Sequence, residues 1–126
     1  MPSQVFTAND TWNWPADVTD VTAEAIGGAG GGAGAGFNPC TGGGGKGGGY
    51  ALKAITKGAE ASLTITVATA GAAGAAASGA GGAGSQSLVI QDGVTVLRAV
   101  GGNGGGPPTA NSTNGVGATG DNGTAI

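Results

Sequence analysis

The chain has 126 residues, of which 31 are Gly and only 9% are charged. Four Lys and Arg residues against seven Asp and Glu residues give a formal net charge of −3, which excludes the basic surface of a nucleic-acid-binding protein. The length fits one domain, 1–126, in which Gly-rich tracts at 27–49, 71–84 and 101–123 separate shorter runs with a period of two.

The first 15 residues predict a β-hairpin. Two runs rich in β-branched and aromatic residues, 4–7 and 11–14, flank the turn-prone triplet 8–10. Alternation along a strand places Trp12 and Trp14 on one face. We interpret this face as part of the core or as a contact with a partner or a second copy of the chain.

The next two runs, 19–26 and 50–57, alternate in the same way and predict two strands. The residues expected to face the core are Val21, Ala23 and Ala25 in the first run and Tyr50, Leu52 and Ala54 in the second. Lys53 and Lys57 would then face water.

Three more runs complete the expected strands. Residues 61–69 predict a half-buried strand with Leu63, Ile65 and Val67 on one face. Residues 87–91 and 95–100 flank Asp92-Gly93, a pair that favours a tight hairpin turn. The sequence therefore predicts an all-β fold, a small β-sandwich or jelly-roll-like domain of roughly seven strands with the Gly-rich tracts at one end.

The Gly-rich tracts could form flexible linkers or ordered loops. Flexible linkers are rich in Gly and Ser, whereas these tracts are rich in Gly and Ala. Spacing by three, as at Gly71 and Gly74 and at Gly117, Gly120 and Gly123, suits packed polyproline II helices, which have three residues per turn. We therefore expect ordered polyproline II-like loops.

No pattern of chemically active residues indicates an enzyme. The chain has no His, its carboxylates show no metal-loop spacing, and Cys40 is the single cysteine. Residues 40–47 differ from a phosphate-binding loop, which needs Gly at position 40 and Ser or Thr at position 47. We expect no catalytic residues, no cofactor, no metal, no nucleic-acid partner and no membrane insertion.

Several motifs resemble a known family. They are Val-Phe-Thr followed by Thr-Trp-x-Trp-Pro within 5–15, Val-Thr-Asp-Val-Thr at 18–22, Gly-Gly-Tyr-Ala at 48–51 and Leu-Thr-Ile-Thr-Val at 63–67. Together with the Gly tracts they resemble the glycine-rich domain found in phage tail and appendage proteins. The resemblance to fibre-tip adhesins, whose tips are built from packed polyproline II helices, is looser.

The first residues, Met-Pro-Ser-Gln-Val-Phe, lack the basic stretch and apolar core of a secretory signal, so we expect no signal peptide. The resemblance implies a bacteriophage virion protein that is made in the host cytoplasm. Its expected role is that of a tail-appendage tip that binds a host receptor, with other virion proteins and further copies of itself as partners. The positions implied as receptor contacts are Phe37, Asn38, Pro39, Lys46, Asn103, Pro107, Pro108, Asn111 and Asn114. The alternatives are a capsid decoration or head-fibre protein and, from another class, an ice-binding or cell-wall-like structural protein.

Overall fold

The computed structural model describes residues 2–35, 41–76, 79–108 and 124–125. These residues form seven strands and no helix. The strands are β1 (Asp10–Asn13), β2 (Asp20–Ile26), β3 (Tyr50–Thr56), β4 (Ser62–Thr66), β5 (Ser87–Gln91), β6 (Val94–Ala99) and β7 (Thr124–Ala125). The described residues contain no helix that is long and apolar enough to span a bilayer.

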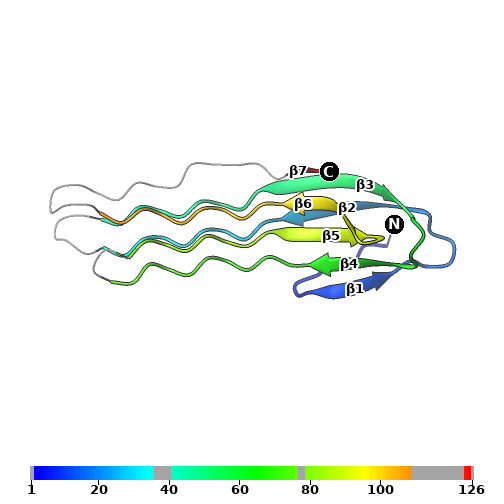
Figure 1. Ribbon diagram of the computed structural model, residues 1–126, viewed down its shortest axis with the longest axis horizontal. Coiled ribbons are helices and arrows are strands. Elements are labelled where there is room, and N and C mark those ends of the chain that lie inside the picture. Colours follow the sequence, from blue (N-terminus) through cyan, green and yellow to red (C-terminus); the bar gives the residue numbers. More distant parts are fainter. Residues whose placement is uncertain (1, 36–40, 77–78, 109–123, 126) are drawn as a thin grey trace.

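The strands form two antiparallel sheets. One sheet has the order β1-β4-β5-β6-β7 and the other contains β2 and β3 (Figure 1). The smaller sheet packs on one half of the larger one, because β2 contacts β5 and β6 while β3 contacts β6 and β7. The predicted all-β sandwich is confirmed.

The core lies between the two sheets and is small. Its buried apolar residues are Trp14, Ala51, Ile55, Leu63, Val89, Leu97 and Ala99. Leu97 and Ala99 in β6 are 0% exposed, because β6 pairs on both sides, with β5 and β7, and lies under the smaller sheet. In β2 the burial alternates as predicted, with Val21, Ala23 and Ala25 half-buried and the residues between them exposed.

The hairpin between β5 and β6 turns at Asp92 and Gly93, as the sequence predicts. Both residues have positive φ, 51° and 73°, which is the geometry of the two-residue turn that matches strand twist. The Asp92 carboxylate also accepts hydrogen bonds from the N–H groups of Ala59 (2.9 Å) and Glu60 (2.6 Å). This turn therefore anchors the connection between β3 and β4.

The predicted N-terminal hairpin is wrong. Residues 4–7 form no strand, and β1 pairs instead with β4, where Trp12 lies opposite Leu63. An isolated two-stranded ribbon is marginal in water, whereas pairing with β4 places the indole of Trp12 against the core. The apolar surface buried by pairing β1 with β4 therefore outweighs the advantage of the short turn that would join residues 4–7 to 11–14.

The predicted core face of β3 is also wrong. Ala51 and Ile55 are buried, whereas Tyr50 is 50% exposed and Leu52 47% exposed. The reason is the register with β2: Leu52 lies opposite Glu24 and Tyr50 opposite Ile26 on one face. Turning Leu52 inward would carry the Glu24 carboxylate toward the core, which costs more than exposing a leucine.

The strand predicted over 61–69 is confirmed in its centre and ends earlier. Leu63 is buried and Ile65 half-buried, but β4 stops at Thr66. Beyond it, side chains satisfy the backbone: the N–H of Val67 donates to Asn9 Oδ1 (2.8 Å) and that of Ala68 to Ser87 Oγ (3.0 Å). The chain thus leaves the sheet before entering a Gly-rich segment.

Candidate binding surface formed by the glycine-rich segments

In the described part of the chain, five extended Gly- and Ala-rich segments leave the sandwich at one end and run side by side, so the molecule is elongated (Figure 1). Each continues or precedes a strand of the sandwich. We number them in chain order as segment I (27–35), segment II (41–49), segment III (68–76), segment IV (79–86) and segment V (100–108).

Backbone hydrogen bonds join these segments at every third residue. The N–H groups of Gly28, Gly31 and Gly34 in segment I donate to the carbonyls of Ser85, Gly82 and Gly79 in segment IV, at 2.9, 2.8 and 2.8 Å. Those of Gly27, Gly30 and Ala33 donate to Gly49, Lys46 and Gly43. A period of three is that of polyproline II, whose backbone groups bond to neighbours rather than within the helix.

Segment I lies at the centre of the bundle. It bonds to all four other described segments, because Gly71 donates to Ala29 (2.7 Å) and Gly102 donates to Gly28 (2.8 Å). Segment V also bonds to segments II and IV, and segment IV to segment III. The segments therefore form two layers, one of II, I and III and the other of V and IV, which overlap in Figure 1.

Glycine is required where these backbones meet. A Cβ atom added at Gly28, Gly31 or Gly34 would overlap the backbone carbonyls of Thr69, Ala72 and Ala75 respectively. At Gly44 and Gly47 of segment II, by contrast, a Cβ would have nothing within 4 Å. Only some of the glycines are therefore needed for the close approach of two backbones, whereas Gly44 and Gly47 face solvent.

The sequence profile of the glycine-rich domain matches residues 4–126. The chain belongs to this family. No curated protein and no solved structure matches it.

In segments I and II of this glycine-rich domain, small residues at every third position face outward. Ala29, Gly32 and Ala35 of segment I are exposed, as are Gly44 and Gly47 of segment II. Because each segment turns once in three residues, these positions repeat along the same side. They form a surface of methyl groups and bare backbone, which sequence inspection missed although the three-residue spacing of positions 29, 32 and 35 signals it.

Of the predicted contact positions, Lys46 and Asn103 lie side by side. The backbone N–H of Lys46 donates to the carbonyl of Asn103 (3.0 Å); Lys46 is half-buried and Asn103 exposed. Pro107 is half-buried and Pro108 is buried. The remaining positions, Phe37, Asn38, Pro39, Asn111 and Asn114, lie outside the described residues, as does Cys40.

The two tryptophans face each other in the sandwich. Their ring centroids are 5.0 Å apart at an interplanar angle of 67°, an edge-to-face contact. Trp14 is 7% exposed and belongs to the core, and Trp12 is half-buried against the same core; a role of the two as partner contacts stays a prediction. The face that Trp12 and Trp14 share therefore lies against the core of the sandwich.

The carboxylates of Asp20 and Asp92 accept hydrogen bonds at strand ends and from the backbone. No three of its His, Cys, Asp and Glu side chains group closely enough to hold a metal ion. Asp20, at the start of β2, accepts hydrogen bonds from the hydroxyls of Thr56 (2.7 Å) and Thr19 (2.9 Å). These bonds lower the pKa of the Asp20 carboxyl, and the Thr56 bond fastens the end of β2 to β3.

Proposed function

We propose that this glycine-rich domain is a non-enzymatic surface component of a bacteriophage virion, in which the sandwich carries a stiff, projecting bundle that binds a host receptor. The observation that carries the proposal is the backbone hydrogen bonding of the bundle at every third residue. Segments fixed in this way lose little conformational entropy on binding, so they favour affinity without large apolar patches.

The elongated shape supports this role. The described ends of segments I and II lie at the end of the molecule opposite the sandwich (Figure 1). The sequence places non-glycine residues such as Phe37 and Asn38 between these two ends. In this proposal, variation of these residues changes the binding specificity while segments I and II stay the same.

Binding of the labelled protein to a panel of intact bacterial strains tests the proposal. We expect binding to some strains, loss of binding when residues 36–40 are replaced by glycines, and no change in Lys53→Ala or Lys57→Ala, which lie in or beside β3. Recovery on purified virions without cell binding would favour capsid decoration. Absence from virions together with absence of cell binding would contradict the proposal.

A second candidate function, ice binding, is favoured by one observation. The layer of segments II, I and III exposes small, uncharged residues in regular columns, as at Ala29 and Ala35. A regular, weakly hydrated surface of this kind suits a flat ligand better than an irregular receptor. Thermal hysteresis in a solution of the protein, lost on Ala35→Lys, would support this candidate over the first.

A further inference from the structure

Strand β2 has an open edge. Among the described residues it pairs with β3 alone. The N–H of Lys57 donates to Thr19 (2.7 Å) and that of Gly27 to Gly49 (2.8 Å), so the odd-numbered residues of β2 bond to β3. The backbone groups of Thr22 and Glu24 therefore point away from β3, and in the described part of the chain they have no hydrogen-bond partner.

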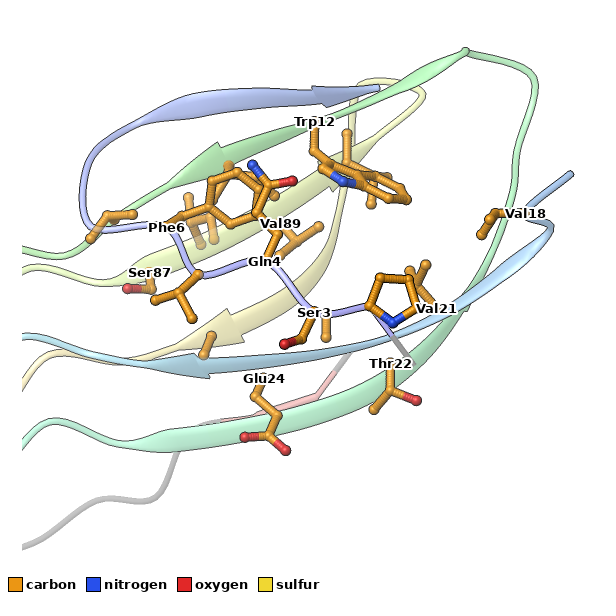
Figure 2. A pocket seen from close by; sticks show the side chains of 18 of the residues that line it. Ser3, Gln4, Phe6, Trp12, Val18, Val21, Thr22, Glu24, Ser87 and Val89 are labelled. Atoms are coloured by element: carbon orange, nitrogen blue, oxygen red, sulfur yellow. The ribbon is translucent and has the colours of Figure 1, made fainter. Parts of the chain in front are cut away.

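A groove of about 1350 Å³ borders this edge (Figure 2). It exists because β2 contacts β5 and β6 but not β4 or β1, so that no strand of the described residues covers the half of the larger sheet formed by β1 and β4. Its floor includes Trp12, Leu63, Ile65 and Val89 from the inner side of that sheet. The groove thus combines unpaired backbone groups on one wall with an apolar floor. This arrangement can accept one further β-strand beside β2.

The N-terminal residues 2–7 lie in this groove without pairing to it (Figure 2). They form no hydrogen bond in the described part of the chain, Val5 is 84% exposed and Phe6 is half-buried. A segment held only by partial burial of one ring is displaced at little cost. It leaves the edge of β2 available to another strand.

The charges around the groove indicate what kind of strand fits. Asp17, Asp20 and Glu24 line it, and none of the described residues that line it is Lys or Arg. In a strand added beside β2, alternate side chains would pack inward on Leu63 and Ile65, and those between them would lie on the outer face beside Glu24. Apolar residues suit the inward positions, and cationic residues suit the outward positions beside Glu24.

We propose that the open edge of β2 is a strand-acceptor site that binds an extended segment of a partner protein in which apolar and basic residues alternate. The segment forms backbone hydrogen bonds with Thr22 and Glu24 and covers the apolar floor of the groove, a recognised mode of peptide binding. A second copy of the chain fits less well, because pairing of two β2 edges brings the carboxylates of Asp20 and Glu24 from both copies onto one face. The site does not depend on the proposed function.

Amide hydrogen exchange with a probe peptide tests the proposal. The probe is a capped heptapeptide of alternating Val and Lys, which matches the 7 residues of β2. Its binding is expected to slow exchange at Thr22 and Glu24 by about tenfold or more, while Val21 and Ala23, which already bond to β3, change little. The matched peptide of alternating Val and Glu is expected to bind about tenfold more weakly.

Two variants separate charge from backbone pairing. Asp17→Asn combined with Glu24→Gln is expected to weaken binding of the Val/Lys peptide by about three- to tenfold. Glu60→Gln, an exposed carboxylate outside the groove, is the matched control and is expected to leave the affinity unchanged. Thr22→Pro, which removes an edge N–H, is expected to abolish binding, whereas Thr22→Val retains it.

The proposal is overturned by absence of binding at millimolar peptide or by binding that leaves exchange at Thr22 and Glu24 unchanged. Equal affinity for the Val/Lys and Val/Glu peptides overturns the basic character of the partner. Protection of the same two amides in a dimer without peptide overturns the choice of occupant in favour of a second copy. The wild-type exchange experiment decides these points even where Thr22→Pro does not fold.

Discussion

At the scale of single residues, a few polar side chains hold the sandwich together where its strands end. Asp20 accepts hydrogen bonds from Thr56 across the two-stranded sheet and from Thr19 beside it. Asp92 accepts two backbone N–H groups from the β3–β4 connection while it occupies a turn position with positive φ. Both carboxylates therefore stabilise the ends of strands and the turn between β5 and β6.

The hydrogen bonds to Asp20 predict its titration behaviour. Since the pKa of Asp20 is lower in the folded chain than in the unfolded chain, its contribution to stability is present above the ordinary Asp pKa and is lost as the pH falls through the lowered value. NMR titration of the side-chain carboxyl is expected to show the lowered pKa, and Thr56→Val should raise it toward the ordinary value. An unchanged pKa in Thr56→Val would contradict the assigned cause.

Asp92 should be sensitive to the loss of both its roles. Asp92→Ala removes both acceptor oxygens of the carboxylate. It also places alanine, which disfavours positive φ, at φ 51°. We therefore expect a loss of about 1–3 kcal/mol in the free energy of unfolding. Asp92→Asn tolerates positive φ and keeps one acceptor oxygen, so it should lose less. Urea denaturation of the two variants checks the order, which equal losses would contradict.

At the scale of elements, the Gly-rich segments form a bundle because their backbones approach closely at fixed intervals. Segment I has neighbours on several sides, and its glycines at positions 28, 31 and 34 meet the carbonyls of segment III. Interior positions of this kind exclude any side chain, whereas outward positions do not. The composition of the tracts follows from the packing rather than from a need for flexibility.

Substitution of individual glycines should separate these two classes. Gly30→Ala would drive a methyl group into the backbone carbonyl of Asn103, so we expect a loss of about 1–3 kcal/mol or more in the free energy of unfolding. Gly44→Ala places its methyl group in open space and should be neutral or slightly stabilising, because alanine has less conformational freedom in the unfolded chain. Chemical denaturation of the pair measures the difference. Equal stabilities would show that the bundle does not pack as described.

At the scale of the whole molecule, the bundle and the sandwich share the same chain segments. Segment I continues β2 directly, and segments II and V adjoin β3 and β6 in the same way. The hydroxyl of Ser87 in β5 also donates to the carbonyl of Ile26 (2.7 Å) where β2 passes into segment I. Loss of either part therefore removes the fixed ends on which the other depends.

This sharing predicts a single unfolding transition. Tryptophan fluorescence, which reports on Trp12 and Trp14 in the sandwich, and amide exchange at Gly31 and Gly74, which reports on the bundle, should give the same midpoint in urea. Gly30→Ala should lower both midpoints equally. A bundle that melts first, with fluorescence unchanged, would contradict the prediction and show that the sandwich folds alone.

Much of the fold follows from local patterns in the sequence. The alternation over β2, the Asp92-Gly93 turn and the central part of β4 were predicted correctly, because each depends on neighbouring residues only. The family was also evident from motifs that lie along the chain. Of the candidate site residues, Lys46 and Asn103 lie together, but Trp14 and Pro108 are buried, which composition and spacing do not reveal.

The sequence by itself determined the all-β class, the strand-forming runs and the need for glycine, because periodicity and backbone sterics are local properties. Only the tertiary structure decided which strands pair, which face of β3 is buried and where an edge stays open. Pairing of β1 with β4 and the outward turn of Leu52 reflect competition between distant segments for one small core. The open edge of β2 has the same origin, since two strands are too few to cover five.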